Sequence, residues 1–116
     1  MTEGKLYEIV FLCNPRNLSG KVELFTQEVR DTMVYKDKII AVKTMPLFPA
    51  YTTIPLVKAV LLEDSGFLSH VVIIAREFGK TVIRVPKGAL DELVGKKIDV
   101  DSKNNIMRIT DQEGGE

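Results

Sequence analysis

The chain has 116 residues, of which 45% are hydrophobic and 28% are charged, proportions that suit a single globular domain, here residues 1–116. Its 16 basic and 16 acidic residues leave no net charge, which argues against nucleic acid or an anionic membrane as a partner. A stretch of about 18 apolar residues, as a transmembrane helix requires, does not occur, and no secretory leader follows Met1, so we expect a cytoplasmic protein.

Apolar patterns and turn residues predict short strands and a few short helices, with no internal repeat or linker. Residues 26–37 fit either a short helical stripe or an extended edge, and we expect the two prolines in 44–49 to prevent a regular helix there. The other predicted elements are, in chain order, strands at 6–13, 21–25, 38–43 and 57–62, a helix at 50–54 ended by Pro55, a strand at 81–85, a helix at 89–94, a hairpin of 96–101 with 106–109, and a frayed tail at 111–116.

The segment after Ser69 fits two structures. Val71-Val72-Ile73-Ile74 favours a strand by propensity. A helix is favoured by the capping ability of Ser69, by the helical spacing of the apolar residues that follow, and by Gly79, which suits the left-handed position after a helix end. Together with the strands, either structure gives a compact α/β or α+β domain.

The residues that could bind metals or nucleotides are few. Cys13 is the single cysteine, so it forms no intramolecular disulfide, and its apolar neighbours predict a buried role. One cysteine and one histidine cannot make a His/Cys zinc site, and neither a Walker loop nor a Gly-x-Gly-x-x-Gly motif is present. We therefore expect no metal and no cofactor bound by this chain itself.

His70 is the only histidine and the main candidate for chemistry. At a helix start, backbone N–H groups without helical partners and the helix dipole favour a phosphate group, and a neutral imidazole keeps one nucleophilic nitrogen. The alternative is an ordinary surface or core histidine, and Glu63 just upstream is a solvated turn residue or a tuning group.

At these residues the chain resembles a known family. Ser65-Gly66-Phe67-Leu68-Ser69-His70-Val71-Val72-Ile73-Ile74-Ala75-Arg76-Glu77-Phe78-Gly79 is similar to the phosphorylation motif of the PEP-utilising enzymes, roughly Gly-Gly-x-Thr/Leu-Ser-His-Ala-Ala-Ile-Val-Ala-Arg-Glu-Leu-Gly. The resemblance extends over residues 18–109, through Leu18-Ser19-Gly20-Lys21-Val22, through the strand that ends in Thr44-Met45-Pro46, and through Leu93-Val94-Gly95 with the strands that follow.

The resemblance implies an α/β fold of the swivelling β/β/α type, with layered β-sheets, a few short helices, and a helix over 69–78. It implies that His70 accepts a phosphoryl group, that Gly66 and Ser69 shape the loop, and that Thr44 lies near this loop. Arg76 is expected to brace the helix. Ser65, Leu68, Val71 and Val72 depart from the motif, and the two valines replace small residues.

The expected function is that of a stand-alone phosphohistidine domain related to phosphoenolpyruvate synthase and pyruvate phosphate dikinase. It would be a phosphotransferase component that works with a nucleotide-binding or phosphoenolpyruvate/pyruvate-binding subunit, where phosphoenolpyruvate or ATP would bind. Two alternatives remain open. One is a non-catalytic binding or regulatory module, and the other is the small subunit of a split enzyme that docks through Met45, Leu47, Phe48 and Tyr51.

Overall fold

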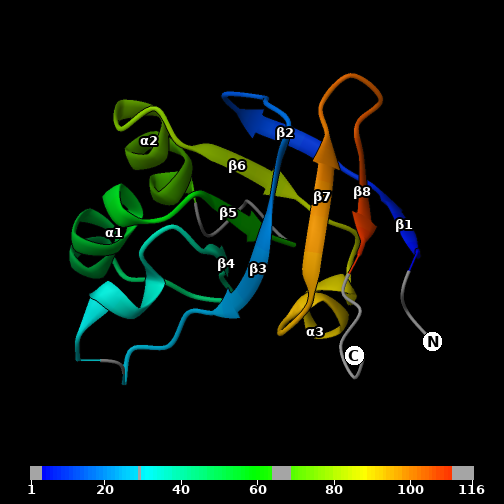
Figure 1. The fold of residues 1–116 in the computed structure, drawn as a ribbon. Helices are drawn as coiled ribbons and strands as arrows, with labels where there is room; N and C mark the ends of the chain where they lie inside the picture. The colour runs from blue at the N-terminus through cyan, green and yellow to red at the C-terminus, as the bar shows by residue number, and fades with distance from the viewer. Residues whose placement is uncertain (1–3, 29, 64–68, 111–116) are drawn as a thin grey trace.

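The computed structural model describes residues 4–28, 30–63 and 69–110, and within them the chain is a mixed α/β domain (Figure 1). Eight strands in these residues follow the order β1-β8-β7-β3-β4-β5-β6-β2 across the sheet. Their bounds are β1 (Leu6–Glu8), β2 (Val10–Cys13), β3 (Leu18–Leu24), β4 (Ile39–Ala41), β5 (Ala59–Leu62), β6 (Thr81–Arg84), β7 (Lys97–Asp101) and β8 (Ile106–Ile109).

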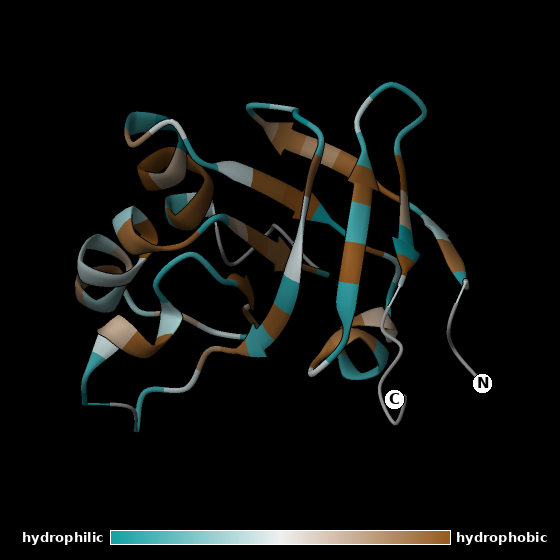
Figure 2. Cartoon of the chain, in the orientation of Figure 1, coloured by the Kyte–Doolittle hydropathy of each residue, from teal (hydrophilic) through white to brown (hydrophobic). Residues whose placement is uncertain are grey.

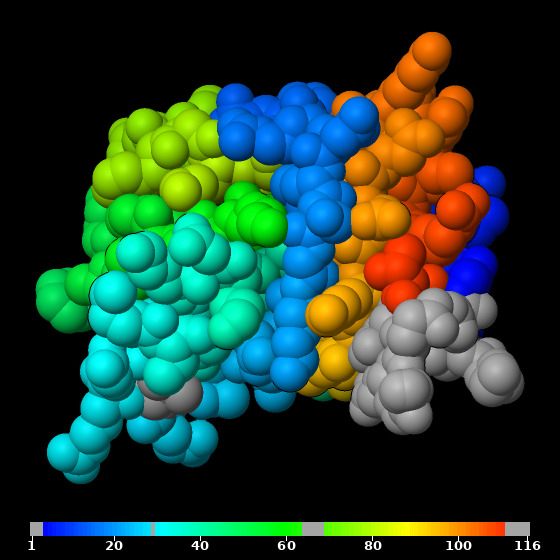
Figure 3. All heavy atoms as spheres, viewed as in Figure 1, coloured from blue at the N-terminus to red at the C-terminus, as the bar shows by residue number. Residues whose placement is uncertain are grey.

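Strand β3 belongs to two sheets at once. Its first residues, Leu18 to Lys21, pair antiparallel with β7, and its last residues, Val22 to Leu24, pair parallel with β4. Figure 3 shows β3 as a blue column between the helical half of the molecule and the orange strands of the hairpin. At the far ends of the strand order, β1 and β2 are separated in sequence by Ile9 alone, so the eight-stranded sheet is nearly closed.

The short helices lie mainly on one side of the parallel strands. Helices α1 and α2 contact each other and cover the same face of the sheet (Figure 1). Their bounds are η1 (Thr32–Tyr35, a 3-10 helix), α1 (Leu47–Thr53), η2 (Ile54–Leu56, a 3-10 helix), α2 (Ser69–Glu77) and α3 (Ala89–Leu93). No helix in residues 4–28, 30–63 and 69–110 has the length and apolar character needed to cross a membrane.

Two hydrophobic cores lie on opposite faces of the parallel strands. On β4, Ile39 and Ala41 belong to a core shared with β7 and β8, whereas Ile40 and the next residue after the strand, Val42, belong to a core shared with α1 and α2. This alternation follows from the period of two along a strand. Because both of their faces are covered, strands β4 and β5 are apolar throughout and brown in Figure 2. The described residues thus form a mixed α/β domain in which a nearly closed eight-stranded sheet is accompanied by a few short helices, as expected.

Two predictions for the first half of the chain need correction, and one open alternative is decided. The strand predicted at 6–13 is broken at Ile9, where the chain passes from the hairpin sheet to the parallel sheet. For the segment 26–37, where a short helical stripe and an extended edge were both open, the described residues form a short helix, the 3-10 helix η1. The prolines at 46 and 49 do not prevent a helix, because Pro46 is the N-cap of α1 and Pro49 lies in its first turn, where an amide hydrogen has no helical partner.

The predictions for the second half are confirmed more closely. Residues 69–77 form helix α2, as the resemblance implied. Gly79 follows it with a φ of 70°, the left-handed conformation predicted for this position. The hairpin of β7 and β8 also forms as predicted. The tail at 111–116 lies outside the described residues.

Candidate functional site

The candidate site lies where the parallel strands end. Strands β3, β4, β5 and β6 are mutually parallel, so their carboxyl ends share one edge of the sheet. In open α/β sheets the loops at this edge commonly build the binding site. The loop after β4 carries Thr44 and Met45, and the chain after β5 leads into α2, which starts at Ser69. The fold thus brings two sequence-distant segments of the predicted site to the same edge.

His70 is the second residue of α2 and is half-buried. Its Nε2 atom lies 2.6 Å from the backbone oxygen of Met45. Since a carbonyl oxygen can only accept, Nε2 must carry the hydrogen of this bond. In the neutral ring the lone pair is then on Nδ1.

The local sequence explains why His70 sits at the margin of the core. Val71, Ile74 and Ala75 have helical spacing and are buried against the parallel sheet. His70 precedes Val71 by one residue, a rotation of about 100° around the helix, which carries its ring to the edge of the buried face. The opposite side of the helix is exposed at Ile73.

Met45 presents its carbonyl from a well-anchored loop. Its side chain is 1% exposed and belongs to the core under α1 and α2. The next residue, Pro46, begins α1, and its carbonyl accepts a hydrogen bond from the amide of Ala50. The prediction that Met45 belongs to an exposed docking patch is wrong, because its side chain points into the core.

The other predicted site residues are placed as follows. Thr44 is exposed and directly precedes the residue that contacts His70. Ser69 is exposed and is the first residue of α2. Arg76 is exposed in the last turn of the helix, where a positive charge interacts favourably with the helix dipole. Gly66 lies outside the described residues. The structure therefore brings the His70 helix start and the Thr44–Met45 segment together.

Sequence reasoning missed a small pocket beside the helix start. It measures about 270 Å³ and is lined by Leu12 of β2 together with Ser69, Val72 and Ile73 of α2. Val72, one of the four departures from the family motif, lines this pocket. No spacing in the sequence could have indicated Leu12, because its place depends on the antiparallel pairing of β2 with β6.

The turn after β2 fastens the carboxyl end of α2. The side-chain amide of Asn14 donates to the carbonyl of Lys80 at 2.9 Å, and the guanidinium of Arg16 donates to the carbonyl of Gly79 at 2.7 Å. Cys13 is buried nearby, as predicted, and burial raises the pKa of its thiol. These contacts hold the helix that carries His70 against the sheet.

Charged groups next to the site are bound to helix α3. The carboxylate of Glu63 accepts a hydrogen bond from the amide of Leu90 at 3.0 Å. The ammonium of Lys43 lies 2.6 Å from Asp91, and this hydrogen bond raises the pKa of the lysine. Glu63 is thus neither a free turn residue nor a partner of His70 within the described residues, because it binds the first turn of α3.

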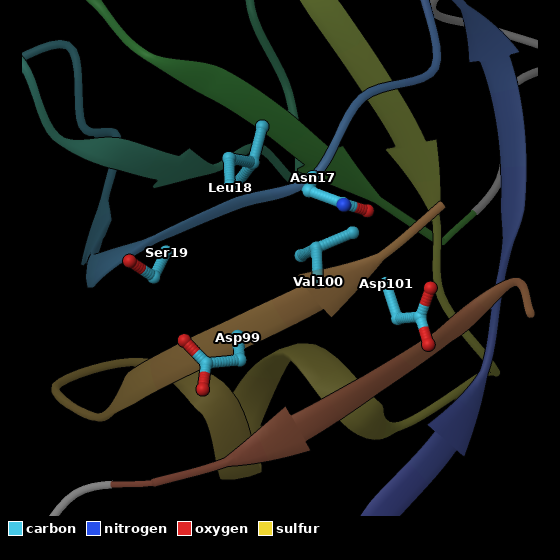
Figure 4. A pocket seen from close by; sticks show the side chains of 6 residues that line it. All are labelled: Asn17, Leu18, Ser19, Asp99, Val100 and Asp101. Atoms are coloured by element: carbon cyan, nitrogen blue, oxygen red, sulfur yellow. The ribbon is translucent and has the colours of Figure 1, made fainter. Parts of the chain in front are cut away.

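A larger depression lies away from His70, between β3 and β7 (Figure 4). It measures about 480 Å³. Its lining residues are Asn17, Leu18, Ser19, Asp99, Val100 and Asp101. Its polar groups serve the neighbouring turn: Asn17 accepts from the amide of Ser102, and Asp101 accepts from Lys103 and Asn104, which lowers the pKa of Asp101. Within the described residues no group of three or more His, Cys, Asp or Glu side chains could hold a metal ion.

The fold and the site together define a class: a layered α/β domain with a single histidine in the first turn of a helix at the sheet edge. Residues 36–105 match the family described as "PEP-utilising enzyme, mobile domain". The match covers more than half of the chain, so the chain belongs to this family. It spans β4 to the β7–β8 turn and includes the His70 segment.

Solved structures support the fold. The crystal structure of Thermococcus kodakaraensis aconitase X in its holo-form is similar with a TM-score of 0.58 and 12% identity, over 91% of this chain and 98% of that chain. The solution structure of a UPF0107 protein is similar with a TM-score of 0.56 and 11% identity, over 90% of this chain and 98% of that chain. At such low identity these similarities show the fold alone. A comparison with curated proteins found no match.

Proposed function

We propose that this chain is a stand-alone phosphohistidine domain that carries a phosphoryl group on His70 between partner proteins. The observation that carries the proposal is the membership of the chain in the mobile-domain family, combined with the position of its only histidine at the start of α2. A helix start at the carboxyl edge of a parallel sheet is a favourable place for phosphate. Ser69 and Thr44 are exposed near this helix start and carry hydroxyl groups.

The chain would act as one component of a phosphotransferase in the cytoplasm. Its site offers one nucleophile, and no described pocket combines His70 with a cluster of charged groups suited to a nucleotide. A partner subunit that binds a nucleotide or phosphoenolpyruvate and pyruvate would therefore supply the phosphoryl group. Gly66 and Ser69 would shape the loop that meets the phosphate, and Arg76 would brace the helix from its far end.

The direct test is phosphoryl labelling of the full chain. Purified protein is incubated with labelled phosphoenolpyruvate or ATP and candidate donor enzymes, and the bound phosphate is tested for the acid lability and base stability of phosphohistidine. We expect label in the wild-type chain and none in His70→Ala. Ser69→Ala is a matched neighbour that keeps the nucleophile, so it should still be labelled. Equal labelling of wild type and His70→Ala would exclude the proposal, as would the absence of label with every donor.

A second candidate function is the small subunit of a split enzyme. It is favoured by an apolar stripe on α1, where Leu47, Phe48 and Tyr51 are 56%, 76% and 48% exposed. Tyr51 lies one turn from the other two residues, so the three side chains share one helix face. Figure 3 places α1, in green, at the left edge of the molecule.

In this second function the stripe would dock on a larger catalytic chain. The test is purification from the source cell with Phe48→Ser as the variant and Ile73→Ser, an exposed residue of α2, as the control. A stoichiometric larger chain should accompany the wild type and the control but not Phe48→Ser. If no larger chain accompanies the wild type, the subunit role is wrong.

A further inference from the structure

Large apolar side chains are exposed on two neighbouring elements, η1 and α1. Met33 and Val34 of η1 are each 53% exposed. Leu47, Phe48 and Tyr51 are exposed on α1, which contacts η1, and Figure 1 shows the two elements side by side. We call these five side chains the α1–η1 surface. It extends the apolar stripe of α1 onto a second element.

The area of the α1–η1 surface matches what a small dimer needs. From their exposed fractions, and with about 150–250 Å² for a large side chain, the five residues expose on the order of 500 Å². Apolar patches of about 300–600 Å² are the largest on a typical monomer and are often functional. Two copies that meet through this surface would bury about 1,000 Å² from these side chains alone, which is the area that a biological interface is expected to reach.

The charges around the surface also suit a second copy of the chain. Residues 44–57, which contain α1 and η2, include no charged side chain, and the core of an interface is depleted of charge and enriched in aromatic residues and Met. Beside η1, exposed charges of both signs follow one another, Arg30 with Asp31 and Lys36 with Asp37. A two-fold arrangement can set opposite signs of such a rim against each other. The whole chain has no net charge, so two copies do not repel at long range.

We propose that the α1–η1 surface is a self-association site, where a second copy of this chain docks to form a two-fold dimer. Phe48 is 76% exposed and is the expected anchor, because a few large side chains at the centre of an interface carry most of the binding energy. Helix α1 begins directly after Met45, whose carbonyl contacts His70, so the dimer would place both His70 sites beside the interface. The proposal concerns assembly and does not depend on phosphoryl transfer.

The mass of the pure wild-type chain is measured first. Sedimentation equilibrium of the full chain, with no other protein present, should give about twice the monomer mass of 13.0 kDa. We expect a dissociation constant of about 1–100 μM, because the buried area lies at the lower end of the range for specific interfaces. A monomer at about 1 mM would overturn the proposal. An open series of larger species would also overturn it, since a two-fold interface closes on itself.

Variants then locate the interface. Phe48→Ser should raise the dissociation constant at least about 30-fold, as expected for a central aromatic anchor. The matched control is Leu6→Ser, because Leu6 is 50% exposed on β1, at the opposite end of the molecule from α1 (Figure 1), and it should change the constant less than about threefold. Equal effects, or an unchanged dimer in Phe48→Ser, would overturn the proposal. Circular dichroism checks folding, and Tyr51→Ser replaces Phe48→Ser if that variant does not fold.

Tyr51 gives a second measurement in the wild-type chain. The chain has three tyrosines and no tryptophan, and Tyr7 and Tyr35 are buried, so Tyr51 is the tyrosine that acrylamide reaches from solvent. Quenching of tyrosine fluorescence should fall at least about twofold as the protein concentration rises through the dissociation constant, because the interface core excludes solvent. In Phe48→Ser it should stay high over the same range. A wild-type dimer with undiminished quenching would associate through another face, and the proposal would be wrong.

A larger chain is the alternative occupant of this surface. If the pure wild type is a monomer, and a stoichiometric larger chain accompanies it but not Phe48→Ser, the dimer is overturned and the split-enzyme function is supported. Labelling with phosphoryl donors bears only on the role of His70. Failure of the dimer and failure of the phosphohistidine function are therefore distinguishable.

Discussion

Thr53 carries a buried hydroxyl group whose removal should raise, and not lower, the stability of the protein. It is the last residue of α1 and is fully buried. Within the described residues its hydroxyl oxygen has no hydrogen-bond partner. A buried hydroxyl without a partner costs about 1–3 kcal/mol of stability. Thr53→Val keeps the β-branched shape and removes the hydroxyl, so we expect it to stabilise the chain.

The expected gain in the free energy of unfolding is about 1–2 kcal/mol, because local relaxation in the wild type already offsets part of the cost of the unpaired hydroxyl. An unfolding entropy of about 2.1 cal/mol/K per residue, taken over 116 residues, makes each kcal/mol worth about 4 °C in Tm. The variant should therefore melt about 4–8 °C above the wild type.

The assay is reversible thermal and urea unfolding followed by circular dichroism. Thr52→Val on the same helix is the matched control, because Thr52 is exposed and its hydroxyl donates to the carbonyl of Pro49 at 3.1 Å. This control should be neutral or slightly destabilising, within about 0.5 kcal/mol. If Thr53→Val melts below the wild type, the hydroxyl has a partner such as a buried water, and the argument from its unpaired burial is refuted.

Three further predictions follow from packing and charge. Ile74→Ala, in the core under α2, should lower the free energy of unfolding by about 2–5 kcal/mol. The control Ile73→Ala, at an exposed position of the same helix, should change it by less than about 0.5 kcal/mol. Equal effects of the two variants would show that α2 packs on the sheet through another face. The hydrogen bond from Lys5 lowers the pKa of Glu92 in the folded chain. The contribution of this contact to the free energy of unfolding is therefore present above the carboxyl pKa of the unfolded chain and is lost as the pH falls through the lowered pKa of the folded chain. Glu92→Gln should therefore unfold at lower urea than wild type at pH 7, with the difference vanishing in acid; a constant difference would contradict the linkage. Burial raises the pKa of Cys13, so a disulfide reagent should modify the folded chain much more slowly than the unfolded chain at pH 8, and equal rates would show that the thiol is accessible.

The elements that the sequence predicted well are those whose signal is local. Gly79 follows α2 in the left-handed conformation, which is predictable because the steric cost of that conformation depends on the residue type alone and is absent for glycine. The β7–β8 hairpin likewise follows from a short turn between alternating strands. The helix over 69–77 was ambiguous from propensity, since Val71 to Ile74 are β-branched, and the family motif resolved it.

The elements that could not be predicted depend on contacts between distant residues. The break at Ile9 exists because the chain changes sheets there, which only the pairing of β1 with β8 and of β2 with β6 reveals. The burial of Met45 and the binding of Glu63 to Leu90 depend on how loops meet across the sheet. Of the candidate site, the sequence therefore predicted His70 and its helix, but not the carbonyl of Met45 that contacts its ring.

The departures from the family motif have separate structural consequences. Val71 is fully buried in the core under α2, so its extra bulk packs against the sheet. Val72, one residue further, lines the pocket with Leu12 and Ser69. The helical rotation of about 100° per residue thus sends two adjacent valines to different places, the core and the pocket. The side of His70 that faces Met45 is set by the loop after β4 and not by either valine, so the contact to Nε2 depends on a part of the chain outside the helix that carries the histidine.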